Sequence, residues 1–264
     1  MFACEYSFFP KQGGEREIFL QDFWPFVGAL GKGGQTVNED CIIQVRSTIH
    51  YICICPEKDS LNTRHHTSYA AKAYKKLLKI SARKPHIKIT GEVLETPRAC
   101  QCKRRPFLYL FTHFLDRSSP AVCGKCRQPV PLYRLPRFEN GAYDDILGWQ
   151  EIYRNCDSLF MESCAGEMFG YRQMSDLNSE LTILGRKLCT FLERKTGVPV
   201  FYHLHRYYGK SSRTELKRRC PGCNGQWLLN KPMGLFDFCC KKCRLFSVIA
   251  PDCPVNRTST MKKP

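Results

Sequence analysis

Four cysteines near the C-terminus have a spacing that suits a bound metal ion. Cys220 and Cys223 enclose Pro-Gly, Cys240 and Cys243 enclose Lys-Lys, and 16 residues separate the two pairs. Thiolates at i and i+3 fit a tight knuckle turn, and four thiolates with no open position are typical of structural zinc. The pattern therefore predicts one Zn²⁺ in a zinc ribbon. Cys239 is an alternative ligand, although only Cys240 keeps the knuckle spacing to Cys243.

A second set of cysteines lies in the middle of the chain. Cys100 and Cys102 form Cys-Gln-Cys, Cys123 and Cys126 enclose Gly-Lys, and 20 residues separate the pairs. A Cys-x-Cys pair is a less usual zinc knuckle, so four unligated thiols are the alternative, and His113 could replace one thiolate. Because unpaired cysteines tend to scatter rather than gather in twos, the set favours a second zinc site.

Basic residues concentrate toward the C-terminus. The net charge is +17, and residues 186–264 hold 17 basic residues against four acidic ones. A basic end of this kind favours a polyanion such as RNA or DNA, and an acidic protein is the alternative partner. Closing the ribbon would gather the cations that flank its knuckles into one patch. The predicted nucleic-acid-binding residues are Arg206, Lys210, Arg213, Lys217, Arg218, Arg219, Lys241, Lys242 and Arg244.

Aromatic and polar residues alternate in the segment before the ribbon. In a strand, Phe201, His203, His205 and Tyr207 would share one face, with Tyr202, Leu204, Arg206 and Tyr208 on the other. One face could be a platform on which bases stack, since aromatic side chains serve that purpose in single-strand binders. The alternative is that the aromatic residues are core and the histidines face solvent. The pattern leaves both interpretations open.

The remaining pattern predicts an α+β fold, a small mixed sheet with packed helices. Strands are expected at 2–9, 47–55, 86–94, 107–114 and 198–208, and helices at 18–30, 62–80, 143–164 and 176–196. Apolar residues on both faces of 47–55 indicate a central strand buried on both sides. We expect an α+β body at 1–210 with a Cys-rich element at 98–128, a basic zinc ribbon at 211–250 and a basic tail at 251–264.

The order of these motifs resembles a known family. Cys-x-Cys, an apolar strand, and Cys-x2-Cys are followed by Pro-Val-Pro-Leu-Tyr-Arg-Leu-Pro at 129–136, the helix with Gly185-Arg186, and the terminal ribbon. This arrangement is similar to an uncharacterised bacterial family whose members are described as Zn-ribbon-containing and nucleic-acid-binding. The resemblance spans most of the chain up to Cys243. It implies zinc binding and a nucleic-acid partner.

The sequence carries no catalytic signature. Gly-Lys-Gly-Gly at 31–34 lacks the phosphate-loop pattern, and neither a nucleophile elbow nor a His-Glu-x2-His helix occurs. We therefore expect a binding protein rather than an enzyme. The N-terminus does not read as a signal peptide, no run of 18 apolar residues occurs, and 17 cysteines suit thiols and metal ligands. The expected compartment is the cytoplasm, with no membrane partner.

Overall fold

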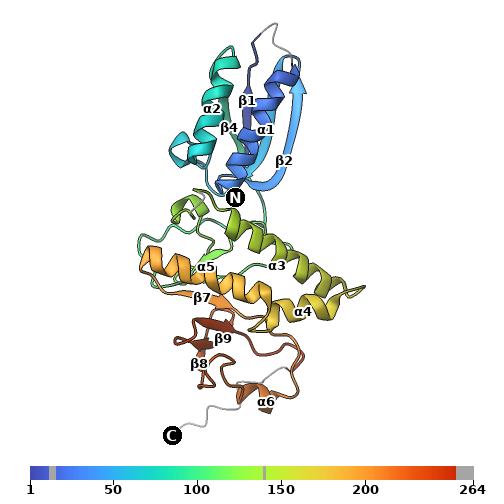
Figure 1. The fold of residues 1–264 in the computed structure, drawn as a ribbon, viewed down its shortest axis with the longest axis vertical. Helices are drawn as coiled ribbons and strands as arrows, with labels where there is room; N and C mark the ends of the chain where they lie inside the picture. The colour runs from blue at the N-terminus through green and yellow to red at the C-terminus, as the bar shows by residue number, and fades with distance from the viewer. Residues whose placement is uncertain (12–15, 139–140, 254–264) are drawn as a thin grey trace. The chain divides into compact units, whose positions relative to one another are not determined.

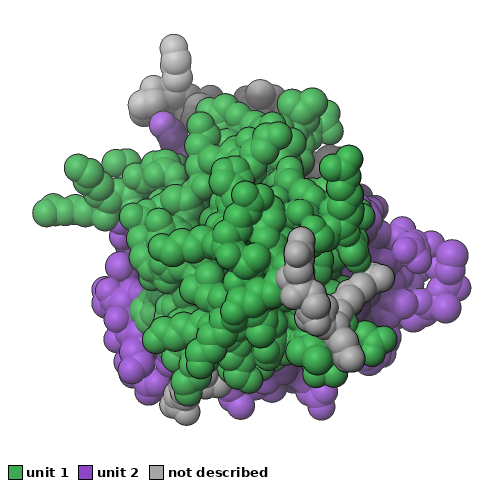
Figure 2. Space-filling view, turned by 90° about the horizontal axis from the view of Figure 1, so that it is seen from above, with its two compact units in different colours: residues 1–104, 116–148 green, residues 105–115, 149–264 purple. Residues whose placement is uncertain are grey.

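The computed structural model describes residues 1–11, 16–138 and 141–253. The chain forms two compact units, coloured separately in Figure 2. Unit 1 comprises residues 1–104 and 116–148, and unit 2 comprises residues 105–115 and 149–264. Most of the predicted basic tail, residues 254–264, lies outside the described residues.

Unit 1 is built on a four-stranded sheet in the order β2-β3-β1-β4, from β2 (Val37–Val45), β3 (Thr48–Cys55), β1 (Phe2–Phe8) and β4 (His86–Glu92). The neighbouring strands are antiparallel. The helices α1 (Arg16–Lys32) and α2 (Ser68–Ile80) lie beside each other on the sheet (Figure 1). Phe8, Phe23, Tyr51 and Leu77 are among the buried side chains that join strands to helices. One helical layer therefore covers one face of this sheet.

The single covered face corrects the expectation for β3. Tyr51 and Cys53 are buried beneath the helices, whereas Ile52 on the opposite face is 38% exposed. β3 is central, because it pairs with β1 and β2, but it is buried on one face only. Helix α2 also begins later than predicted. Its N-cap is Thr67, and Asn62 caps a separate 3-10 turn, η1 (Thr63–His65).

Short elements surround the mid-chain cysteines of unit 1. The strand β6 (Ala121–Cys123) ends at one of them, and the 3-10 turn η2 (Leu132–Arg134) follows them. Val122 and Pro129 form a β-bridge that closes the loop between them. Helix α3 (Asp144–Glu162) begins in unit 1 and belongs to unit 2 from Trp149 on, and it starts with two acidic residues in its first turn, as the helix dipole favours.

Unit 2 contains strands in the order β5-β7-β10-β9-β8, from β5 (Leu108–Leu110), β7 (Val200–His203), β10 (Leu245–Ser247), β9 (Phe236–Cys240) and β8 (Leu228–Met233). β7 is parallel to β5 and β10, and β9 is antiparallel to β10 and β8. The ribbon strands β8, β9 and β10 therefore continue the sheet that contains β5 and β7. The fold class α+β is confirmed, with two sheets where one was expected.

Helix α5 (Glu180–Thr196) packs directly on β7. Ser179 caps its N-terminus and Gly197 ends it at φ 68°. A Cβ at Gly185 would lie 2.2 Å from Cε2 of Tyr202, so glycine permits the close approach. The predicted helix at 176–196 is shorter than expected, because Asp176 ends helix α4 (Glu167–Ser175) and a turn separates it from α5. Helix α6 (Ser212–Leu216) leads into the ribbon.

Candidate metal centres and basic surfaces

The four C-terminal cysteines meet in unit 2 as their spacing predicted. The Sγ atoms of Cys220, Cys223, Cys240 and Cys243 lie within 4.8 Å of one another, and those of Cys223 and Cys240 are 3.6 Å apart. Sulfurs bound tetrahedrally at the usual Zn–S length are about 3.8 Å apart. The group is therefore positioned to bind a metal ion.

Backbone hydrogen bonds shape the first knuckle around these sulfurs. The amide of Asn224 donates to the carbonyl of Cys220 at 2.8 Å, and Asn224 takes the left-handed conformation at φ 56°. A Cβ at Gly222 would lie 2.9 Å from Sγ of Cys243, so this position needs glycine. The amide of Gly225 and the neighbouring thiols lower the pKa of Cys223 to about 7, which favours the thiolate that a metal requires.

The structure also resolves the choice between Cys239 and Cys240. Both residues are in β9, where successive side chains point to opposite faces. Cys240 belongs to the four-cysteine group and Cys239 does not. The amide of Cys239 donates to the carbonyl of Trp227, whose ring is buried over the ribbon core. Cys240 is therefore the fourth member of the group, and Cys239 is not part of it.

The mid-chain cysteines form a second group, entirely within unit 1. Cys100, Cys102, Cys123 and Cys126 have their Sγ atoms within 4.8 Å of one another, and His113 is not part of the group. Its Cys-x2-Cys pair has the same knuckle as the ribbon: the residue after it, Arg127, has φ 59° and donates its amide to the carbonyl of Cys123 at 2.8 Å. This group is also positioned to bind a metal ion.

A buried carboxylate supports this second group, and the sequence analysis missed it. Glu57 accepts hydrogen bonds from Arg134 at 2.5 Å, Tyr133 at 2.9 Å and Gln101 at 2.8 Å. Arg134 also donates to the carbonyl of Cys100 at 2.9 Å. Outer hydrogen bonds of this kind hold the chain around metal ligands. In the sequence, the only sign of this hydrogen-bond network is the run at 129–136, which contains Tyr133 and Arg134.

The predicted nucleic-acid-binding residues fall into two sets. Three have internal partners. Arg206 and Arg218 pair with Glu215, whose side chain is 1% exposed, and Arg244 pairs with Glu193 at 2.9 Å. The exposed set is Lys210, Arg213, Lys217, Arg219, Lys241 and Lys242. The cations of this second set have no carboxylate partner among the described residues.

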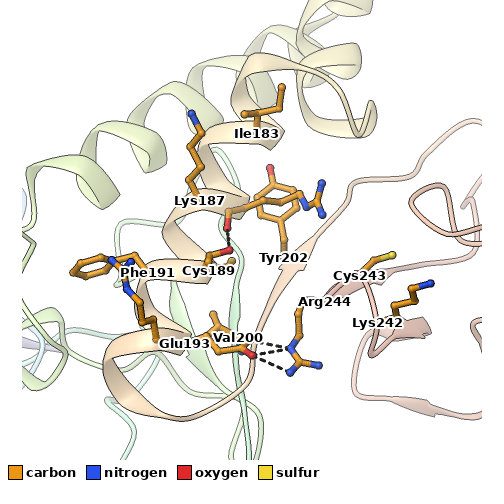
Figure 3. Close-up of a pocket in the computed structure, with 13 residues that line it drawn as sticks. Ile183, Lys187, Cys189, Phe191, Glu193, Val200, Tyr202, Lys242, Cys243 and Arg244 are labelled. Atoms are coloured by element: carbon orange, nitrogen blue, oxygen red, sulfur yellow. Dashed lines mark hydrogen bonds and ion pairs between the residues drawn. The ribbon is translucent and has the colours of Figure 1, made fainter.

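A hollow of 720 Å³ lies between α5 and the second knuckle of the ribbon (Figure 3). Five cations line it: Arg186, Lys187, Arg194, Lys242 and Arg244. Its single carboxylate, Glu193, is occupied by Arg244 and by the amide of Val200. The hollow therefore carries a surplus of positive charge. The α5 cations were absent from the prediction, because the fold alone brings this helix beside a knuckle some 50 residues later.

Most of the aromatic segment before the ribbon is core. On the predicted platform face, Phe201 and His203 are buried and Tyr207 is exposed, so the face is not a platform for stacked bases. Phe201, Tyr202, His203 and Leu204 are all buried, and the ring of Phe201 stacks on that of Phe246 at 4.3 Å. His203 packs between the rings of Phe111 and Phe236, and neither of its ring nitrogens has a hydrogen-bond partner among the described residues. Burial lowers the pKa of His203 to about 3 and that of His205 to about 4.

These two histidines predict a pH-dependent stability. Their pKa values in the folded protein lie below the unfolded value of about 6.5, so the unfolded chain binds protons more readily as the pH falls. Lowering the pH from 7 to 6 should reduce the free energy of unfolding by about 0.7 kcal/mol per histidine. Urea unfolding at both pH values measures this, and His203→Phe should make the difference smaller by about 0.7 kcal/mol, the share of one histidine. An equal pH dependence in wild type and variant would contradict the prediction.

Three protein-family models match successive parts of the chain, and each is described only as a domain of unknown function. They are DUF8589 over residues 1–91, DUF2310 over residues 102–205 and DUF8594 over residues 209–253. These descriptions mention neither a zinc ribbon nor nucleic acid, so that part of the family resemblance stays a prediction. No helix in the described part of the chain is both long and apolar enough to cross a bilayer.

Two relatives and one solved structure complete the comparison. The crystal structure of an antibiotic biosynthesis monooxygenase aligns with 35% of this chain and 99% of its own, at 11% identity. The TM-score of 0.30 is too low to indicate a shared fold. One uncharacterized protein of Haemophilus influenzae is 30% identical over 195 residues, covering 74% of this chain and 75% of the relative. A second is 31% identical over 160 residues, covering 60% and 79%. The chain therefore belongs to the same family as these uncharacterized bacterial proteins.

Proposed function

We propose that the protein is a non-catalytic zinc protein that binds RNA or DNA through a basic surface beside its C-terminal cysteine group. Each four-cysteine group would hold one structural Zn²⁺, because four converging thiolates leave no open position for a substrate or water. We call the nucleic-acid surface the α5–knuckle surface, and it comprises Arg186, Lys187, Arg194, Lys241 and Lys242. The hollow between α5 and the ribbon supports this proposal most directly.

The charge balance of that hollow favours a polyanion. Arg244 and Glu193 neutralise each other, which leaves three lining cations on α5 and one on the knuckle without a carboxylate partner among the described residues. Such a surface binds phosphates by charge, with little dependence on base sequence. Four other predicted contacts are exposed in the segment before the first knuckle and stay predictions: Lys210, Arg213, Lys217 and Arg219.

The same lining offers no evident catalytic group, which supports a binding role. Burial raises the pKa of Cys189 well above its ordinary value, and its thiol faces the carbonyl of Phe201. A thiol of this kind is a poor nucleophile, because the thiolate is the reactive form. Cys243 belongs to the metal group and Glu193 is held by Arg244.

The proposal predicts binding that depends steeply on salt. Fluorescence anisotropy with labelled single-stranded and duplex RNA and DNA should show binding at about 50 mM salt that weakens strongly by about 200 mM. The triple variant Lys187→Glu, Arg194→Glu, Lys242→Glu should reduce the slope of log affinity against log salt by about 2 to 3, since each lost phosphate contact removes almost one.

The matched control is a second triple reversal, at Lys72, Lys75 and Lys79. These lysines are exposed on α2 and do not line the hollow beside α5, so their variant changes the net charge equally without touching the surface. If both triple variants weaken binding equally, the surface is not the site. If the wild-type protein binds no nucleic acid at low salt, the proposal fails. An acidic protein partner would then be the better interpretation, and its capture should survive nuclease treatment.

A further inference from the structure

Unit 1 has a basic hollow of its own, beside the mid-chain cysteine group. The hollow has a volume of 750 Å³ and is lined by residues on both sides of the group, from 98–104 and from 125–128. Arg98, Lys103, Arg104 and Lys125 supply four positive charges, and none of the nine lining residues is acidic. The sequence gives no sign of a binding role for these residues, because the charge of residues 1–185 is nearly balanced overall.

The positive charge of this hollow is largely uncompensated. Lys103, Arg104 and Lys125 are exposed and form no ion pair with a described residue. Arg98 meets Glu92 at 3.4 Å, but its side chain is 82% exposed, and pairs this exposed contribute little. A divalent ion held by four thiolates would have a formal charge of −2, so four cations exceed what the metal group itself needs.

Hydrogen bonds around the cysteine group hold the two lining segments in place. The amide of Cys100 donates to the carbonyl of Pro129 at 2.8 Å, and that of Cys123 donates to the carbonyl of Gln128 at 3.0 Å. Arg134 fixes the carbonyl of Cys100 from the other side. The cations after Cys102 and the lysine between Cys123 and Cys126 are therefore carried by chain segments that are ordered before a ligand arrives. Preorganised charges of this kind lose less entropy on binding.

We propose that this hollow, which we call the unit 1 basic hollow, is a second surface that binds the phosphate backbone of nucleic acid. Its cations come from two separate chain segments, an arrangement that suits successive phosphates of a strand better than one small anion. The inference rests on the proposed function, because it assigns the same class of ligand to a different unit. Two such surfaces on one chain would raise the affinity for a long strand by joint occupancy.

The test compares two triple variants of the full-length, zinc-loaded protein: Lys103→Glu, Arg104→Glu, Lys125→Glu in unit 1, and Lys187→Glu, Arg194→Glu, Lys242→Glu in unit 2. Each is titrated with a long single-stranded oligonucleotide across a range of salt concentrations. The unit 1 variant should reduce the salt slope by about 2, from three lost single-strand contacts, and weaken binding about tenfold or more. The variant at Lys72, Lys75 and Lys79 should change neither quantity.

The outcomes separate this inference from the proposed function. An unchanged slope in the unit 1 variant, with a reduced slope in the unit 2 variant, would overturn the second surface and leave the first. Absence of binding by wild type would overturn both. Zinc content is measured in parallel, together with the milder variant Lys103→Gln, Lys125→Gln. If affinity falls only when zinc is lost, or if inorganic phosphate competes as well as the oligonucleotide, the hollow does not bind a strand.

Discussion

The wild-type protein and Cys239→Ser are expected to bind two zinc ions per chain, and Cys240→Ser only one. The two substitutions are chemically identical and adjacent in β9. They differ because Sγ of Cys240 lies in the four-cysteine group, 3.6 Å from that of Cys223, and that of Cys239 does not. Cys239→Ser is therefore a matched control for the loss of a thiol from this strand.

The loss of zinc should have a large effect on the ribbon. Structural zinc contributes an apparent 10 to 16 kcal/mol in small zinc domains at neutral pH, and part of this is folding free energy. Pro221, Gly222 and Asn224 of the first knuckle are exposed, so little apolar burial stabilises that turn in the absence of the metal. The strand β10 also pairs with β7, so the damage should spread into the sheet of unit 2. Unit 1 should keep its own metal ion and fold.

Elemental analysis of the purified proteins gives the zinc stoichiometry, and limited proteolysis reports on the ribbon. Cys240→Ser should be cut between residues 217 and 247 under conditions in which wild type and Cys239→Ser resist. The corresponding variant in unit 1, Cys123→Ser, should also lose one zinc ion without exposing the ribbon. Retention of two zinc ions by Cys240→Ser would contradict the ligand assignment. A wild-type protein without zinc would remove the proposed metal sites altogether.

The cysteine groups could be predicted from sequence because the geometry of a knuckle is local. Two thiols three residues apart, with glycine where a side chain would strike a sulfur, already define half of a site. The C-terminal end of α5 is equally local, since Gly197 acts within one turn of the helix, whereas the predicted start at 176 missed the N-cap Ser179. By contrast, the exposure of one face of β3 depends on where α1 and α2 pack. The pattern of residues along β3 does not indicate that these helices cover only one of its faces.

Charged surfaces were the least predictable feature, for a different reason. A count of basic residues does not show which cations have an acidic partner. Glu215 is the single acid in the basic run before the ribbon, and it takes two of the predicted nucleic-acid contacts, Arg206 and Arg218, into the interior. Lys187 and Arg194 of α5 and the cations of the unit 1 basic hollow are exposed instead. The sequence therefore predicted the sign of the charge correctly but not all of its positions.

Glu215→Ala is accordingly expected to destabilise unit 2 severely. The carboxylate is buried and accepts hydrogen bonds from Arg206 at 2.5 Å and from the amide of Ala250 at 3.3 Å. Arg218 lies 3.5 Å away, and burial lowers its pKa to about 10. Removing the shared acid leaves two partly buried guanidinium groups without a counter-charge, which typically costs about 3 to 5 kcal/mol. Urea unfolding measures this loss.

The control is Glu151→Ala in the same unit, which removes an exposed carboxylate whose partner, Arg154, keeps its hydrogen bond to the carbonyl of Phe114. Glu151 meets Arg154 at 3.0 Å with its own side chain 58% exposed, so its loss should cost less than about 1 kcal/mol. A similar cost for both variants would contradict the role given to Glu215.

Arg206→Met separates packing from ligand binding at the same cluster. Arg206 is only partly exposed, at 28% of its side chain, and its guanidinium is directed to Glu215. The variant should therefore lose stability, while the protein that remains folded should bind nucleic acid with unchanged affinity. Anisotropy titrations performed well below the unfolding transition measure that affinity. A variant that keeps its stability and loses affinity would return Arg206 to the nucleic-acid surface, where its position in a basic run first placed it.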